Sequence, residues 1–129
     1  APFGMDRSYV DGPFAPGDSE TLAAVMAGFV RSRLPAASST VVLDPLPAHQ
    51  SGNALGPAFA EGLRQAGFAV ATSAAAPAGA HRIRYLVTPF ENGTLVRLTI
   101  DATDAARHFV RSEAGLQARG PFMVRERSS

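Results

Sequence analysis

Gly52, Gly56 and Gly62 follow a short apolar run and open a helical pattern, which raises the question of a phosphate-binding loop. A Walker loop needs a lysine that reaches the outer phosphates, and this chain contains no lysine. A dinucleotide-binding turn needs the spacing G-x-G-x-x-G, which these glycines do not have. The stretch therefore predicts the start of an amphipathic helix and no cofactor.

The residues that could act as a nucleophile or hold a metal are few and separated in sequence. Ser51 lies close to His49, but the chain has no G-x-S-x-G elbow that would expose a nucleophilic serine. His49, His81 and His108 form no H-x-x-x-H pair, and the absence of cysteine removes thiolate chemistry. The sequence predicts no catalytic residue and no metal ligand, so we do not expect an enzyme.

Arginine supplies all 12 basic residues, and several recur on the predicted strands of the C-terminal half. If these arginines share one face of a sheet, they form a basic patch for an anionic partner; otherwise they form ion pairs on a solvated face. The formal net charge is only +1, and aromatic residues do not interleave with the arginines as in RNA-binding sheets. We therefore expect no nucleic-acid partner. The arginines concerned are Arg82, Arg84, Arg97, Arg107 and Arg111.

The overall composition fits one folded domain. The 129 residues are 46% hydrophobic and 18% charged, which suffices for an ordinary core. No apolar run approaches the roughly 20 residues needed to cross a bilayer. No signal peptide is visible, and the sequence begins at Ala1 without methionine, which is compatible with a targeting segment before it.

The N-terminal residues 1–17 carry three prolines and three glycines and show no hydrophobic period. We expect a flexible, extended tail here, followed by a single α+β domain over residues 18–129. The aromatic residues Phe3, Tyr9 and Phe14 of this tail are candidates for docking on a partner protein. The alternative is that they pack on the domain itself.

Two amphipathic helices are predicted. The first spans residues 19–33, with Asp18 or Ser19 as a capping residue. The second begins at Asn53 as a cap and ends at Gly67, because glycine adopts the positive φ of a helix end at little cost. Each helix carries one apolar stripe at helical spacing: Leu22, Val25, Met26, Phe29 and Val30 on the first, and Leu55, Phe59, Leu63 and Ala66 on the second.

The remaining segments are rich in β-branched residues or alternate between polar and apolar side chains, which predicts strands. Asn92-Gly93 marks a hairpin, and Gly93 is expected to take positive φ there. The order αβαββββ predicts two helices packed on one face of a small mixed, mostly antiparallel sheet. The predicted strands are residues 39–43, 68–72, 81–90, 95–102, 107–112, 116–119 and 122–125.

Three runs, LPAASSTVVLDPL, GNALGPAFAEGLRQAGFAV and GPFMVRE, resemble the TrbH family of conjugal-transfer proteins. The resemblance covers residues 18–126. Such proteins are small lipoproteins encoded among the mating-pair-formation genes of type IV secretion systems. The resemblance implies a protein on the periplasmic side of the outer membrane that contacts other subunits of the secretion channel. It carries over no active site. Because the family is anchored through a lipid-modified cysteine and this chain has none, the anchor would precede Ala1.

These features favour a structural component of a conjugative type IV secretion apparatus that acts by protein–protein contact. A periplasmic binding module for a small ligand or cell-wall glycan is the second hypothesis, and an enzyme is the third. An assembly subunit should expose apolar or aromatic surface outside its core. A ligand module should have a deep pocket with convergent polar groups, and an enzyme should add strongly perturbed titratable groups.

Overall fold

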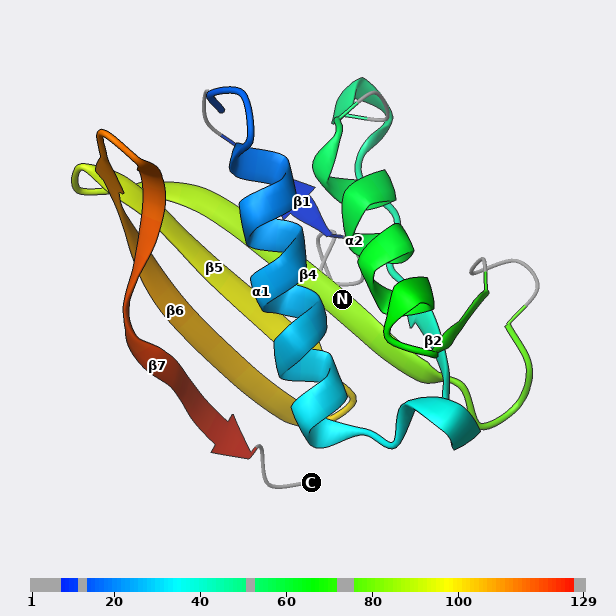
Figure 1. Ribbon diagram of the computed structural model, residues 1–129. Coiled ribbons are helices and arrows are strands. Elements are labelled where there is room, and N and C mark those ends of the chain that lie inside the picture. The colour runs from blue at the N-terminus through cyan, green and yellow to red at the C-terminus, as the bar shows by residue number, and fades with distance from the viewer. Residues whose placement is uncertain (1–7, 12–13, 51–52, 72–75, 127–129) are drawn as a thin grey trace.

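The computed structural model describes residues 8–11, 14–50, 53–71 and 76–126. Helices α1 (Asp18–Arg33) and α2 (Leu55–Gln65) lie side by side on one face of a seven-stranded mixed sheet (Figure 1). The predicted fold class, α+β with both helices on one face of the sheet, is confirmed. Within the part of the chain described, no helix is long and apolar enough to span a membrane.

The strands are β1 Tyr9–Val10, β2 Thr40–Leu43, β3 Ala69–Ala71, β4 His81–Phe90, β5 Gly93–Ile100, β6 Thr103–Ser112 and β7 Gly115–Glu126. Their order across the sheet is β3-β2-β4-β5-β6-β7. β2 runs parallel to both of its neighbours, whereas β4 to β7 form an antiparallel meander. β1 is parallel to β4 and pairs with Leu86 and Val87, beyond the stretch of β4 that pairs with β2.

α1 has nearly the predicted bounds, but the prediction of a side-chain cap is wrong. The helix follows Gly17, whose φ is 90°, and no side chain caps its first turn. The Asp18 carboxylate instead accepts a hydrogen bond from the backbone N–H of Ala15 at 2.8 Å and forms an ion pair with Arg111 of β6. Tertiary contacts therefore take the side chain away from its own helix. The buried stripe comprises Leu22, Ala23, Met26, Ala27 and Val30, with Val25 and Phe29 partly buried beside it.

α2 starts and ends largely as predicted. Ala54 directly precedes the helix, and its side chain caps nothing. Asn53, one position earlier, accepts a hydrogen bond from the N–H of Leu55 through Oδ1 at 2.8 Å. Gly67 has a φ of 106°, so the prediction of a left-handed residue at the helix end is confirmed. The fully buried side chains of the helix are Leu55, Phe59 and Leu63.

The core fills the layer between the helices and the sheet. The ring of Phe59 meets that of Tyr85 edge-on, with centroids 5.5 Å apart. Gly62 allows the two helices to approach, since a Cβ at this position would lie 3.3 Å from the Cβ of Ala27. The alternation predicted for β4 and β5 is confirmed by the buried pairs Ile83–Ile100, Tyr85–Leu98 and Val87–Val96.

Besides shifts of one or two residues in β2, β3 and β5, the strands differ from the prediction at three places. Tyr9–Val10 forms a strand inside the segment expected to be a tail. β6 begins at Thr103, four residues earlier than expected, because residues 101–102 suffice for the turn, with Asp101 at a φ of 54°. β7 is one long strand, and its pairing with β6 is irregular between Ala106 and His108.

The hairpin at Asn92-Gly93 is present, but the prediction of positive φ at Gly93 is wrong. The turn is formed by residues 91–92, Glu91 has a φ of 53°, and Gly93 already belongs to β5 with φ outside the left-handed region. The position instead requires glycine because a Cβ there would lie 1.8 Å from the carbonyl oxygen of Phe109 on β6. The neighbouring strand, and not the turn, excludes a side chain.

Candidate functional site

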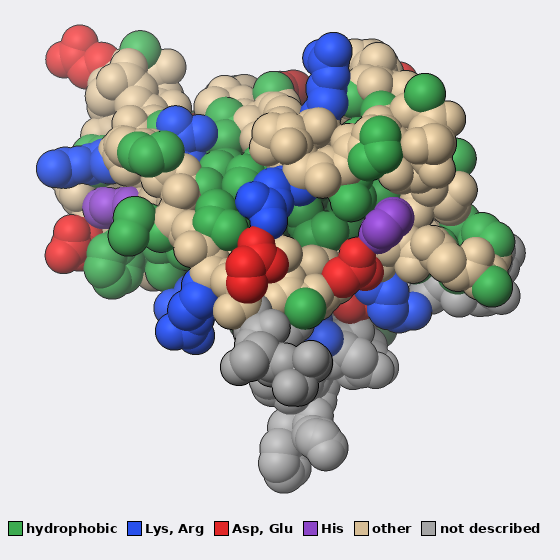
Figure 2. All heavy atoms as spheres, turned by 90° about the horizontal axis from the view of Figure 1, so that it is seen from below, with side chains coloured by type: hydrophobic (Ala, Val, Ile, Leu, Met, Phe, Trp, Pro, Cys, Tyr) green, Lys and Arg blue, Asp and Glu red, His purple; other side chains and the backbone are tan. Residues whose placement is uncertain are grey.

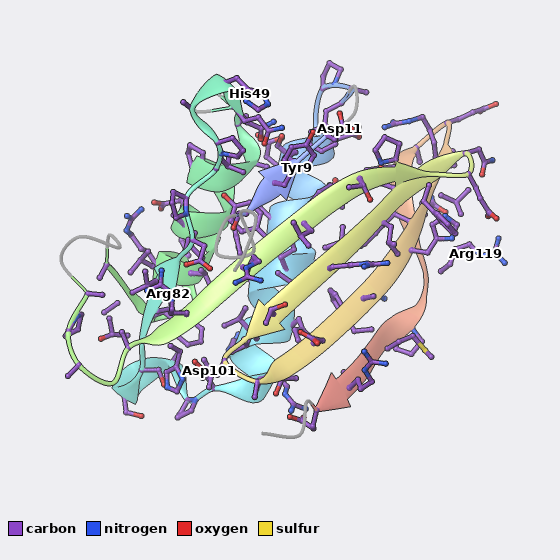
Figure 3. All side chains as sticks on the ribbon, turned by 180° about the vertical axis from the view of Figure 1, so that it is seen from behind. Tyr9, Asp11, His49, Arg82, Asp101 and Arg119 are labelled. Carbon is purple, nitrogen blue, oxygen red and sulfur yellow. The ribbon has the colours of Figure 1, made fainter. Side chains whose placement is uncertain are left out.

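Of the three N-terminal residues predicted to dock on a partner, the structure describes two, which lie in different environments. Phe3 lies outside the described residues. Tyr9 is 36% exposed on β1, whereas Phe14 is half-buried and packs against the core. Figure 3 shows Tyr9, Asp11 and His49 at the same end of the molecule.

Besides the β1–β4 pairing, four hydrogen bonds join residues 8–11 to the domain, two of them to β4 and two to the segment after β2. The N–H of Ser8 donates to the carbonyl of Pro45 at 3.0 Å, and its hydroxyl oxygen accepts from the N–H of Tyr85 at 3.1 Å. The N–H of Val10 donates to Oε1 of Gln50 at 3.0 Å. The N–H of Asp11 donates to the carbonyl of Val87 at 2.7 Å. This part of the N-terminal segment is therefore fixed on the domain.

In the described part of the glycine-rich stretch, glycine allows close packing and does not form a phosphate-binding loop. Gly52 lies outside the described residues. A Cβ at Gly56 would lie 3.0 Å from the hydroxyl oxygen of Tyr85, so this glycine makes room for the tyrosine under α2. Burial raises the pKa of Tyr85 to about 12, because the charged phenolate is disfavoured away from water.

A small hollow of about 440 Å³ lies at the N-terminal ends of α1 and α2. Glu20 and Asn53 are among the residues that line it. The carboxylate of Glu20 opposes an anion at this place, although two helix N-termini would favour one. The hollow therefore does not restore the phosphate-binding interpretation.

The three histidines do not come together. His81 bonds to the Asp101 carboxylate at 2.6 Å, the His108 ring packs edge-on against Phe90 with centroids 5.0 Å apart, and His49 lies in a short 3₁₀ helix. Among the described residues, no three His, Asp or Glu side chains are placed to hold a metal ion.

The pairing register places the five predicted arginines on opposite faces of the sheet. Arg82 and Arg84 alternate with the buried residues of β4, and Arg97 does so on β5, so these three project from the face without helices. Arg107 and Arg111 lie on the helix side of β6. The five arginines therefore do not share one face, and three of them, Arg82, Arg84 and Arg111, lie beside an aspartate in ion pairs.

The two arginines on the helix side are engaged within the domain. The guanidinium of Arg107 lies over the rings of Phe109 and Phe122, at 5.8 and 5.5 Å from their centroids, and Nε donates to the carbonyl of Gly120. Arg111 pairs with Asp18, whose side chain is 3% exposed. Burial acts to raise the pKa of Asp18, but the hydrogen bonds from Arg111 and Ala15 and the charge of Arg111 outweigh it, so the pKa is lowered.

On the other side of the sheet, two arginines share one carboxylate. Arg82 donates to Oδ1 of Asp44 from Nε at 3.1 Å and from Nη2 at 2.7 Å. Nε of Arg84 is 3.6 Å from Oδ2 of the same residue, which is too long for a hydrogen bond, and this buried nitrogen has no acceptor among the described residues. Asp44 is only 3% exposed. One buried carboxylate thus faces two cations.

We call the surface of β4 to β7 that no helix covers the open face; Figure 3 shows it from the front. A broad hollow of about 770 Å³ lies over it. Met123 is 75% exposed at this hollow, the largest exposure among the large apolar side chains described. Sequence reasoning missed Met123 and Arg125, although the alternation of β7 placed them on one side. The hollow is lined by Arg84, Leu86, Leu95, Arg97, Leu98, Thr99, Asp104, Ala105, Ala106, Met123, Val124 and Arg125.

Several other charged side chains of the surface are paired with one of opposite charge. In the view from below, acidic and basic side chains lie next to one another around a central apolar area (Figure 2). Arg33 of α1 pairs with Glu126 of β7, which also accepts a hydrogen bond from the hydroxyl of Thr103. That hydrogen bond and Arg33 lower the pKa of Glu126. By contrast, arginines outnumber acidic residues at the hollow of the open face.

The described residues form a small two-layer α+β domain that carries apolar and arginine-bearing surfaces. The chain matches the family described as conjugal transfer protein TrbH over residues 2–128, so it belongs to that family and is a component of conjugal transfer. This confirms the resemblance found in the sequence. No curated protein and no solved structure matches the chain. TrbH is not a known enzyme family.

Proposed function

We propose that this protein is a structural component of a conjugative type IV secretion apparatus, acts by protein–protein contacts, and is not an enzyme. The observation that carries the proposal is membership of the TrbH family over nearly the whole chain. We further propose that it is a lipoprotein on the periplasmic side of the outer membrane, held by an N-terminal lipid anchor. Its partners in this proposal are other subunits of the secretion channel.

The described surface supports an assembly role over a ligand-binding one. Large apolar side chains are exposed outside the core, as expected for a subunit that contacts others: Tyr9, Phe90, Met123 and Val124. The broad hollow over the open face lies on the exposed side of a sheet and is not a deep pocket with convergent polar groups. A periplasmic binding module for a small ligand or glycan is therefore less well supported.

The assembly role is tested by deleting the gene from the transfer system and measuring the frequency of plasmid transfer between cells. We expect deletion to reduce transfer strongly and the wild-type gene to restore it. Metabolic labelling of the full-length protein with a fatty-acid analogue, followed by membrane fractionation, tests the anchor. Unchanged transfer after deletion would contradict the assembly role, and an unlabelled protein outside the outer-membrane fraction would contradict the anchor alone.

We propose Phe3, Tyr9 and Phe14 as partner-docking residues of the N-terminal segment. Because Phe14 packs against the core, its replacement by alanine is expected to lower the melting temperature and is a poor probe of docking. Tyr9 is more exposed, so Tyr9→Ala is the informative variant. We expect it to weaken capture of channel subunits while the melting temperature stays close to that of the wild type. Unchanged capture would leave Tyr9 without a docking role.

A further inference from the structure

We propose that the open face binds an acidic, amphipathic α-helix of another subunit of the transfer apparatus. This inference rests on the proposed function and adds the chemistry of the partner. Three properties of the open face favour such a partner: its apolar residues, its excess of arginine, and a backbone that is already hydrogen-bonded within the sheet.

The apolar part of the open face is suited to burial against a partner. Leu86 lies on β4 and Leu95 on β5, and Met123 is 75% exposed on β7 beside Ala106. A long, flexible thioether adapts to differently shaped partners, and methionine is enriched at such binding surfaces. The other face of the same sheet is covered by two helices, whereas no described element covers these side chains (Figures 1 and 3).

The charge of the hollow indicates an acidic partner. Three arginines line it, Arg84, Arg97 and Arg125, against one acidic residue, Asp104. Arg84 has to share Asp44 with Arg82, and its buried Nε has no acceptor in the described part of the chain. Arg97 is exposed and makes no hydrogen bond or ion pair with the described residues. Arginine forms strong two-pronged hydrogen bonds with carboxylates, so Asp or Glu side chains beside an apolar stripe would complement this surface.

The backbone of the sheet favours a helix over a strand as the occupant. β4, β5 and β6 are paired on both sides, and β7 is paired on one side among the described residues, so the surface of the open face itself presents side chains rather than an unpaired ladder. A strand laid on this face would leave its own N–H and C=O groups without partners, whereas a helix satisfies them internally. The four strands β4 to β7 span about 14 Å at the usual strand spacing, which a helix of about three turns covers.

A second copy of this chain is a poorer occupant. The apolar stripes of α1 and α2 are already buried in the core, so neither helix can offer an apolar face to another molecule. The exposed side of α2 carries both Glu61 and Arg64, which are 3.8 Å apart and neutralise one another. Neither described helix therefore fits as the occupant, and we assign the acidic helix to a different protein.

The first test uses two synthetic helical peptides as probes, each of about five turns with a leucine stripe. One carries glutamate beside the stripe and the other carries lysine at the same positions. We expect fluorescence anisotropy to show binding of the glutamate peptide alone. Arg97→Glu should weaken that binding about tenfold or more, and added salt should weaken it further. Equal binding of both peptides, or of neither, would overturn the proposal.

The matched control is Arg31→Glu, the same charge reversal at an exposed arginine on α1, on the opposite side of the molecule. We expect this variant to bind the glutamate peptide like the wild type. If it weakened binding as much as Arg97→Glu, the effect would come from net charge and not from the open face. Melting curves of both variants verify folding. Arg97→Gln, which removes the charge without reversing it, replaces Arg97→Glu if that variant unfolds.

The second test examines the open face in cells that carry the transfer system. In the deletion strain, a gene carrying Arg97→Glu and Met123→Asp should restore protein level but not transfer, while Arg31→Glu restores both. A photo-crosslinking amino acid at Leu95 should join the protein to an acidic helical segment of another transfer subunit. If deletion itself leaves transfer unchanged, the proposed function fails. If deletion abolishes transfer but the open-face variant restores it, or crosslinks join only copies of this chain, the function stands and this inference fails.

Discussion

Replacing Gly93 with alanine tests why the first hairpin of the meander needs glycine. The new Cβ would lie 1.8 Å from the carbonyl oxygen of Phe109 and 2.9 Å from the Cα of Val110, both backbone atoms of the paired strand β6. Real Cβ atoms essentially never approach closer than 3.0 Å, so the two strands would have to separate by about an ångström. Phe109 is 1% exposed, so that separation also disturbs the core.

The expected loss of stability follows from these contacts. Overpacking in a well-packed site costs about 1–3 kcal/mol, and a weakened ladder hydrogen bond adds about 1 kcal/mol. We therefore expect Gly93→Ala to lower the free energy of unfolding by about 2–4 kcal/mol. For a chain of this size, that corresponds to a decrease in melting temperature of roughly 6–16 °C. Urea and thermal denaturation followed by circular dichroism measure both quantities.

Two comparison variants separate the steric explanation from a conformational one. Asparagine tolerates positive φ much better than alanine does, so Gly93→Asn would be mild if a left-handed backbone were the reason for glycine. The clash predicts that it is at least as destabilising as Gly93→Ala. Gly28→Ala is the control, because a Cβ at that exposed position of α1 meets nothing within 4 Å and should stabilise the helix slightly. A tolerated Gly93→Ala, or an asparagine variant much more stable than the alanine variant, would refute the reasoning.

Three further predictions concern the core, a helix end and an ion pair. Phe59→Ala removes a fully buried ring and should lower the free energy of unfolding, measured by urea denaturation, by about 3–5 kcal/mol. For the wild type, ATP, GTP and NAD should leave the melting temperature unchanged. A dose-dependent rise with any of them would instead indicate a nucleotide site at α2. Gly67→Val should destabilise because a β-branched residue resists the φ of 106°, and Gly67→Asn should destabilise less; the reverse order would contradict this explanation. The pKa of Asp18 is lowered in the folded protein, so its pair with Arg111 stabilises above the unfolded pKa of about 3.9 and is lost as the pH falls through the folded value. Asp18→Asn should therefore be less stable than the wild type at pH 7, and the difference should shrink as the pH falls below the lowered pKa of Asp18. A difference independent of pH would exclude this linkage.

The helices and the central strands could be predicted because their signals are local. α1 and α2 each repeat apolar residues at helical spacing, and Gly67 ends α2 at the predicted place. The alternation in β4 and β5 places apolar residues on one face of each strand regardless of what lies beside it. The order of the segments predicted α+β with both helices on one side of the sheet, and it also carried the resemblance to TrbH.

β1 could not be predicted because a strand of two residues has no period of its own. It forms because Ser8, Val10 and Asp11 find partners on Pro45, Gln50 and β4, all distant in sequence. The cap predicted at Asp18 failed for a similar reason. Its carboxylate meets Arg111, 93 residues away, and a charged hydrogen bond across the fold replaced the local one.

The sequence by itself determined which side chains alternate within each strand, but it could not say which alternating sets meet. Arg82, Arg84 and Arg97 lie on the open face and Arg107 and Arg111 on the helix side, because the pairing register of β4, β5 and β6 decides which sets adjoin. A shift of one residue would exchange the faces of a whole strand. Likewise, the sequence shows a glycine at position 93, but the need for glycine there comes from the carbonyl group of a residue on another strand. Local periodicity thus determined the elements, and only long-range pairing decided which of their side chains form the arginine-bearing surface.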